Sequence, residues 1–163
     1  MGLAPEHAVH PFAPVWDVHC RVLVLGSFPS VRSRQIGFYY GHPQNRFWRV
    51  LERLYGQPVP PDTAGRRSFV LRHGLALWDV LAACDIVGSS DASIRHAVPN
   101  DVPALLASGG IKRVFCNGQR AYALYLRYLD AACDLPVAAL PSTSAANAAW
   151  SLERLTEAWR VIL

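Results

Sequence analysis

Short apolar runs alternate with amphipathic segments along this chain, and this alternation constrains its fold more than any other feature. Four runs rich in Val, Leu, Ile and Ala have the length of buried strands, at residues 21–25, 75–80, 111–118 and 135–140. Segments whose apolar residues have helical spacing lie between or after them, at residues 45–56, 63–73, 100–110, 119–129 and 150–162. This rhythm predicts an α/β fold with a central four-stranded, mostly parallel sheet and helices on both of its faces.

The length of the chain indicates one domain. Its 163 residues can bury a sizeable core but are too few for two ordinary domains. We therefore predict a single domain over residues 1–163, in which the Pro- and His-rich residues 1–20 form a loosely ordered lead-in. The stretch 26–44 is expected to be a loop, and residues 84–100 are expected to be polar and rich in turns.

Charge and cysteine content narrow the possible partners and cofactors. The formal net charge of +4 fits a polyanionic partner, and it fits a mildly basic protein without one equally well. The four cysteines form no C-x-x-C pair, which predicts reduced, mostly buried thiols in a cytoplasmic protein rather than a disulfide framework or zinc site. No apolar run reaches the roughly 18 residues of a membrane span. We therefore expect no cofactor, no metal and no membrane association.

Polar or glycine-containing segments stand where the predicted strands end. They are "GSFPS" at 26–30, Asp79, the Asn117-Gly118 pair and "PSTSAANA" at 141–148. Ligands of open parallel sheets bind outside the carboxyl ends of the strands, so these segments predict the position of a site. Taken alone, each has a simpler interpretation. "GSFPS" lacks both the G-x-G-x-x-G and the G-K-[ST] patterns and could be only a turn, and the serines of 141–148 could cap a helix rather than hold phosphates.

The segment "YYGHPQNRFW", residues 39–48, combines aromatic rings with hydrogen-bonding groups. Phe47 and Trp48 have core spacing. Tyr40 and Asn45 could stack on a flat ligand and hydrogen-bond its edge, as proteins read bases expelled from a duplex, although Asn45 could also be only a helix cap. Arg46 is interpreted as part of a solvated helix face, with DNA contact as the second option. His42 could donate to a phosphate or act as an acid, but a structural role in the turn is favoured. Asn117 is interpreted as a turn residue that could approach the site.

These motifs carry a family resemblance. "VLVLGSFPS…FYYGHPQNRFWRVL" together with "LPSTSAANAAWSLERLTEAWR" resembles the uracil-DNA glycosylase superfamily over roughly residues 20–160. The pattern is most similar to the hypoxanthine-DNA (deoxyinosine) glycosylase branch, which is related to the mismatch-specific uracil-DNA glycosylases. The strand and helix context supports the two short motifs in combination.

The resemblance implies roles for individual residues and also shows departures from the superfamily pattern. Phe28 stands where relatives carry the Asp or Asn that positions water, and the working carboxamide is implied to be Asn45. Tyr40 matches a base-stacking ring. Asp79 stands where uracil enzymes carry a base-reading Asn, and it could accept from a purine N–H or be only structural. Leu140 replaces the His or Asn of the second motif, and the loop that follows has no wedge residue comparable to the Leu or Arg of relatives.

The resemblance therefore implies a monofunctional DNA repair glycosylase that hydrolyses the bond between the sugar and a flipped deaminated base. Hypoxanthine is the first candidate for that base. Its implied partner is double-stranded, lesion-containing DNA, bound by a monomer. Asn45 is the implied catalytic residue. The implied base-binding residues are Gly26, Ser27, Phe28, Tyr40 and Asp79, and the implied DNA-binding residues are Pro141, Ser142, Thr143 and Ser144. Alternatives are a uracil glycosylase acting on G·U pairs, a DNA-binding relative with little or no catalysis, and a nucleotide-binding protein of the same layered fold.

Overall fold

Four parallel strands form the central sheet of the computed structural model, which describes residues 4–163. In spatial order they are β3 (Leu75–Asp79), β2 (Val22–Gly26), β6 (Arg113–Asn117) and β7 (Val137–Leu140). Every neighbouring pair in this sheet is parallel. The α/β fold with a four-stranded parallel sheet, predicted from the sequence, is confirmed.

The inner positions of the strands are apolar because both faces of the sheet are covered. On β2, Leu23 and Leu25 belong to one hydrophobic core, while Val22 and Val24 belong to the other. This alternation is the ordinary pleat of a strand, in which successive side chains point to opposite faces. The continuous run at 21–25 is thus explained by burial on both sides.

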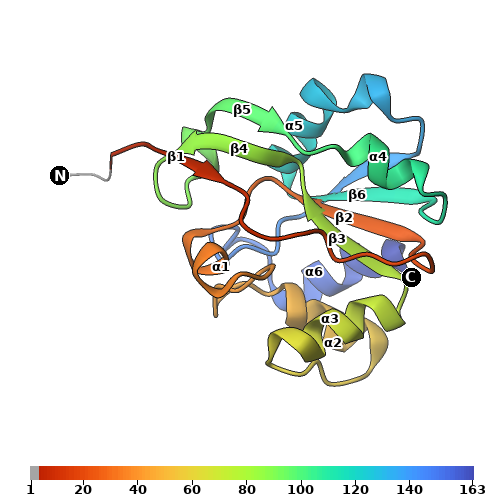
Figure 1. Cartoon of the computed structure of the whole chain (residues 1–163). Helices are drawn as coiled ribbons and strands as arrows, with labels where there is room; N and C mark the ends of the chain where they lie inside the picture. The colour runs from red at the N-terminus through yellow and green to blue at the C-terminus, as the bar shows by residue number, and fades with distance from the viewer. Residues whose placement is uncertain (1–3) are drawn as a thin grey trace.

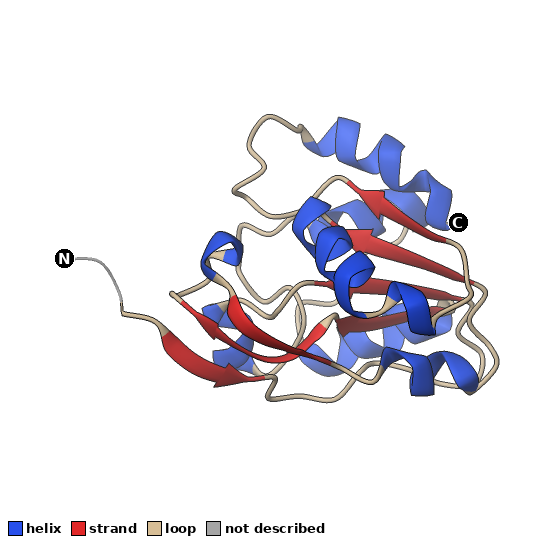
Figure 2. Ribbon diagram, turned by 90° about the horizontal axis from the view of Figure 1, so that it is seen from above, coloured by secondary structure: helices blue, strands red, loops and turns tan. Residues whose placement is uncertain are grey.

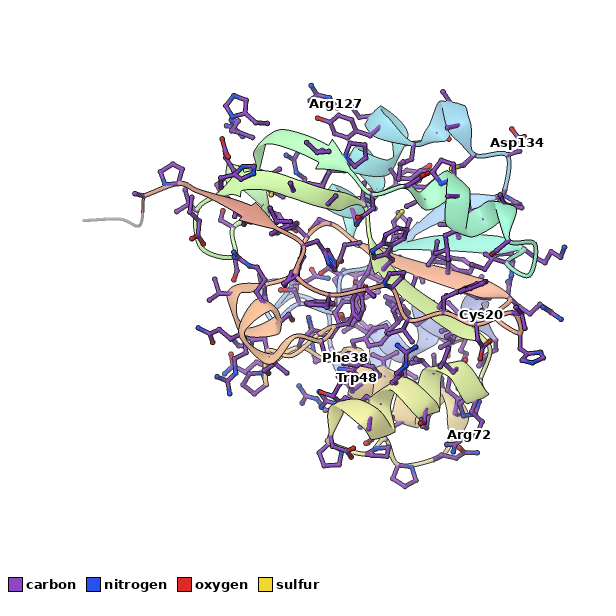
Figure 3. The ribbon with its side chains drawn as sticks, viewed as in Figure 1. Cys20, Phe38, Trp48, Arg72, Arg127 and Asp134 are labelled. Carbon is purple, nitrogen blue, oxygen red and sulfur yellow. The ribbon has the colours of Figure 1, made fainter. Side chains whose placement is uncertain are left out.

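Helices cover the two faces, as Figure 1 shows. One face carries α4 (Val102–Ala107) and α5 (Gln119–Tyr128), and the other carries α2 (Phe47–Tyr55), α3 (Thr63–Arg72) and α6 (Leu152–Trp159). On the second face, Phe38 and Trp48 lie side by side (Figure 3), with ring centroids 6.1 Å apart and nearly parallel planes. Single-turn helices η1 (Asp91–Ser93), η2 (Asp130–Ala132) and η3 (Arg160–Ile162) complete the helical segments. No helix between residues 4 and 163 is long and apolar enough to cross a membrane.

A second, antiparallel sheet was not predicted from the sequence. It contains β1 (Glu6–Val9), β4 (Leu81–Ile86) and β5 (Arg95–Pro99), in the order β1–β4–β5, and Figure 2 shows it beside the central sheet near the N-terminus. The stretch 84–100, expected to be rich in turns, thus also contains the end of β4 and the whole of β5. A short helix, α1 (Val31–Ile36), likewise lies in the stretch expected to be a loop.

Residues 1–20 were predicted to be a loosely ordered lead-in. Residues 1–3 lie outside the described residues, and the rest of this segment includes a strand, β1. Strand β1 pairs with β4 in the register Ala8 to Cys84. Beyond β1 the main chain is still paired with another strand, because Val15 exchanges two hydrogen bonds of 2.9 Å with Leu77 of β3. These partners are far away in sequence, so no local pattern signals the pairing. They place the N-terminal segment along β4 and the edge strand β3, and His10 within it meets Asp79 at the carboxyl end of β3.

Candidate active site

A cavity of about 400 Å³ opens at the carboxyl edge of the central sheet. The last residues of three strands line it, namely Gly26, Asp79 and Asn117, and Ser142 reaches it from the loop after β7. This is the edge at which the sequence placed a site. Nine of the ten predicted site residues line the cavity. The exception is Pro141, whose carbonyl accepts the Trp159 indole N–H of α6 at 3.0 Å.

Asn45 presents one end of its carboxamide to this cavity. Its Oδ1 accepts the Phe47 main-chain N–H at 3.0 Å and the Thr143 hydroxyl at 2.8 Å. Because a main-chain N–H can only donate, the atom facing it must be the oxygen, and this fixes the orientation of the amide. The amide nitrogen donates to no group among the described residues. Asn45 therefore combines a hydrogen bond to the first N–H of α2, whose N-cap residue is Arg46, with an amide nitrogen that has no partner among the described residues, and it lines the same cavity as the Tyr40 ring.

Thr143 holds Asn45 in place. The sequence predicted that it contacts DNA, but its polar groups are engaged within the protein. It is fully buried. Its hydroxyl accepts from Asn117 Nδ2 at 2.9 Å and donates to Asn45, and its main-chain N–H donates to Asn117 Oδ1 at 3.0 Å. Its carbonyl accepts the Arg46 N–H at 2.9 Å. With all of its polar groups engaged, Thr143 connects β6 to α2, and Asn117 has a role in the site rather than in a turn alone.

Tyr40 is held in a strained backbone conformation at the cavity wall. Its φ angle is +52°, a left-handed value that costs a non-glycine residue about 1–2 kcal/mol. Two contacts hold the residue there: its ring stacks on Phe47 at a centroid distance of 4.1 Å, and its carbonyl accepts the Trp48 indole N–H at 3.2 Å. Burial, together with the charge of Asp79, raises the pKa of the phenol, so it stays neutral. A ring backed by Phe47 is a rigid surface for stacking.

Gly26 and Asp79 form the floor of the cavity beneath this ring. A Cβ atom on residue 26 would lie 2.3 Å from Asp79 Oδ1 and 3.5 Å from the Tyr40 hydroxyl, so the carboxylate occupies the space that a side chain would need. Asp79 Oδ2 accepts from His10 Nε2 at 2.7 Å, and both side chains are almost completely buried. His10 comes from the N-terminal segment, and no motif in the sequence pointed to it.

Ser27 and Phe28 complete the wall on the side of the second sheet. The Ser27 hydroxyl donates to Asp91 Oδ1 at 2.8 Å, and the edge of the Phe28 ring packs against His10. Asp91 lines the cavity and was not predicted as a site residue, because it lies in a turn-rich stretch without a recognisable pattern. Burial raises the pKa of the Asp91 carboxyl, and the nearby charge of Asp79 adds to this effect.

Replacing Asp91 by Asn is expected to stabilise the fold increasingly as the pH rises. The folded-state pKa of Asp91 lies above its ordinary value of 3.8, so the folded protein binds the proton more tightly than the unfolded chain. The free energy of unfolding of the wild type therefore falls as the pH rises from that value through the raised pKa. Thermal unfolding of both proteins between pH 4 and 8 measures the difference. The Asp134→Asn variant, which removes an exposed carboxylate, serves as the control.

The loop over residues 141–150 is clamped to α2 by Arg46, which the sequence had assigned to a solvated face. The guanidinium donates to the carbonyls of Ser144 at 3.1 Å and Asn147 at 3.0 Å, and also to that of Trp150. Within the loop, the hydroxyl oxygens of Ser142 and Ser144 accept main-chain N–H groups two residues ahead. Their hydroxyl hydrogens remain available to an acceptor at the rim of the cavity, whereas Arg46 fixes the shape of the loop.

The described residues contain no group of three or more His, Cys, Asp or Glu side chains arranged to hold a metal ion. All four cysteines are free thiols, and three of them are buried. The polar groups that line the cavity are therefore amides, hydroxyls, the His42 imidazole, Asp91 and the Asp79 carboxylate, which His10 contacts from behind. This set can bind and orient a flat, uncharged ring and a water molecule.

Known proteins match this chain along most of its length. The model of the uracil DNA glycosylase superfamily matches residues 13–163. A protein of Methanosarcina acetivorans named hypoxanthine DNA glycosylase is 33% identical over 155 residues, which cover 93% of this chain and 95% of the relative. A protein of the same name from Methanosarcina barkeri is 34% identical over 115 residues, 68% of this chain and 71% of the relative. The solution NMR structure of a Methanosarcina acetivorans protein described as a candidate uracil DNA glycosylase superposes with a TM-score of 0.79 at 30% identity, covering 93% of each chain.

Proposed function

The chain belongs to the uracil DNA glycosylase superfamily, and from this premise we infer that it is a DNA repair glycosylase that hydrolyses the N-glycosidic bond of hypoxanthine in DNA. One observation supports this activity above the others: Asn45, Tyr40 and Asp79 line one cavity. They bring to it an unpaired amide nitrogen, a ring that stacks on Phe47, and a carboxylate. A base swung out of the duplex needs a stacking surface and groups that read its edge.

The hydrogen-bond donors and acceptors of hypoxanthine match the groups that line the cavity. Hypoxanthine carries a ring N–H at position 1, whereas adenine has a lone pair there. The Asp79 carboxylate only accepts hydrogen bonds, so it suits the ring N–H and would repel the adenine lone pair. Its Oδ1 has no hydrogen-bond donor among the described residues. We propose that Tyr40 stacks on the base and that Asp79 accepts from its N1–H.

The bond is broken through a transition state in which the sugar is cationic and the base carries negative charge. Phe28 provides an apolar wall where relatives have an Asp or Asn, so it does not position water. The Asn45 amide nitrogen donates to no group among the described residues, and it would orient the attacking water or stabilise charge on the departing base. Thr143 and Arg46 act indirectly, by holding Asn45 and the loop over residues 141–150.

Duplex DNA as the substrate form, a monomeric enzyme and the cytoplasm as its compartment belong to this proposal. Ser142 and Ser144, at the rim of the cavity, would contact phosphates next to the lesion through their hydroxyl groups. Pro141 contributes through loop shape, since its carbonyl is engaged by Trp159.

Cleavage of a panel of duplexes tests the proposed function. Oligonucleotides that carry one hypoxanthine, uracil, xanthine or undamaged adenine are incubated with excess enzyme, and alkali converts abasic sites to strand breaks. We expect the hypoxanthine duplex to be cut fastest and the adenine duplex to be cut by far the slowest. Faster cutting at uracil would favour the uracil glycosylase alternative, and binding without abasic sites would overturn the enzyme assignment.

A further inference from the structure

His10 inserts an imidazole from the N-terminal segment behind the floor of the cavity. Its main-chain N–H donates to the Ala82 carbonyl at 2.7 Å, which fixes the backbone directly after β1. The ring packs edge-on against Phe12 at a centroid distance of 4.6 Å and approaches Phe28 at 6.1 Å. Its side chain is only 4% exposed. The position of the imidazole is therefore set by the backbone and by aromatic packing.

The imidazole has a single polar partner in this buried environment. Nε2 lies 2.7 Å from Asp79 Oδ2, a length typical of a charge-assisted hydrogen bond, so Nε2 carries the proton. The other ring nitrogen, Nδ1, is buried and has no partner among the described residues. A buried polar atom without a partner is costly, and apolar residues would fill the same volume without that cost. The presence of a histidine here points to a function for its contact with Asp79.

That contact fixes the direction of the Asp79 carboxylate. His10 holds Oδ2, Oδ1 lies over Gly26, and the Asp79 main-chain carbonyl accepts from Asn100 Nδ2 at 2.9 Å. With one oxygen engaged from behind, only Oδ1 is left to accept from a ligand in the cavity. Without the His10 donor, the carboxylate could rotate, and its acceptor atoms would no longer have a defined direction.

We propose that His10 is a positioning residue that holds Asp79 as the acceptor for the ring N–H of a 6-oxopurine, so that the N-terminal segment contributes to base selectivity. This inference rests on the proposed function. It predicts that His10 affects the choice between bases, whereas a residue that only supports the fold would affect all bases alike.

Variants of His10 with and without a donor at the position of Nε2 provide the test. His10→Phe keeps an aromatic ring and removes the donor. His10→Gln places its amide nitrogen near the position of Nε2, and His10→Asn reaches only as far as Nδ1. Single-turnover rates are measured on duplexes with hypoxanthine and with unsubstituted purine, which lacks both the ring N–H and the 6-oxo group. Thermal unfolding shows which variants are folded.

We expect the ratio of the hypoxanthine rate to the purine rate to fall about ten- to a hundredfold in the Phe and Asn variants, and to remain close to wild type in the Gln variant. An unchanged ratio in the folded Phe or Asn variant would overturn the inference and leave the proposed function intact. Should the Phe variant fail to fold, the Gln and Asn variants decide by the same ratio. A wild-type enzyme that is inactive on hypoxanthine would instead overturn the proposed function, and this inference with it.

Discussion

Replacement of Asn45 by Ala is expected to lower the rate of hypoxanthine excision by about 10²- to 10³-fold under single-turnover conditions. The expected loss follows from removing one fixed donor from the site, which in other enzymes costs roughly 3–4 kcal/mol of transition-state stabilisation. The donor is fixed because Oδ1 is held by Phe47 and Thr143, which leaves the amide nitrogen facing the cavity. The measurement is the release of abasic sites from an inosine-containing duplex with enzyme in excess.

A second variant, Asn45→Ser, separates this role from the capping contact at the start of α2. The serine hydroxyl oxygen can accept the Phe47 N–H, but the variant has no amide nitrogen. We expect this variant to unfold at a higher temperature than Asn45→Ala and to be as slow in excision. If Asn45→Ser instead recovers most of the wild-type rate, Asn45 serves only as a cap, and another group must orient the water.

The sequence predicted those parts of the structure that depend on local pattern. The four central strands and the helices around them follow from apolar runs and helical spacing, and the position of the site follows from where parallel strands end. Asn45 and Tyr40 could be identified because aromatic and amide side chains are adjacent in one short segment. Both line the cavity, as that interpretation requires.

Long-range pairing accounts for what the sequence did not predict. Strand β1 has only four residues and gains its stability from β4, more than 70 positions away, as in the pairing of Ala8 with Cys84. His10 follows this strand, so its contact with Asp79 depends on a pairing that local patterns do not report. Asp91 was missed for a related reason, since its partner Ser27 lies 64 positions away.

Predictions from residue type alone were also wrong about which polar side chains face solvent. Thr143 stands in a serine- and threonine-rich loop that suits phosphate binding, yet it is fully buried between Asn117 and Asn45. Arg46 occupies a helix start that suggests a solvated charge, yet it donates to three loop carbonyls. In both cases hydrogen bonds between segments far apart in the sequence decide the role, and they hold Asn45 against the loop.

Replacement of Gly26 by Ala is expected to reduce excision about 100-fold, because it displaces the carboxylate that reads the base. An alanine Cβ would lie 2.3 Å from Asp79 Oδ1, well inside normal contact distance. His10 holds the other carboxylate oxygen, so the side chain cannot move aside without losing a buried hydrogen bond. Misplacement of a site group by about 1 Å is enough for a rate loss of this size. Single-turnover excision from the hypoxanthine duplex measures the effect.

Removal of the carboxylate distinguishes this clash from a general effect on the strand end. Gly26→Ala alone should destabilise the fold by about 1–3 kcal/mol, as overpacking of a buried site does. In an Asp79→Ala background the same substitution should cost much less, since the atom it meets is gone. The coupling between the two changes is read from the unfolding free energies of the four proteins in the double-mutant cycle. Equal costs in both backgrounds would show that the carboxylate does not require glycine at position 26, and would contradict the fixed position of Asp79 on which base selection is argued to depend.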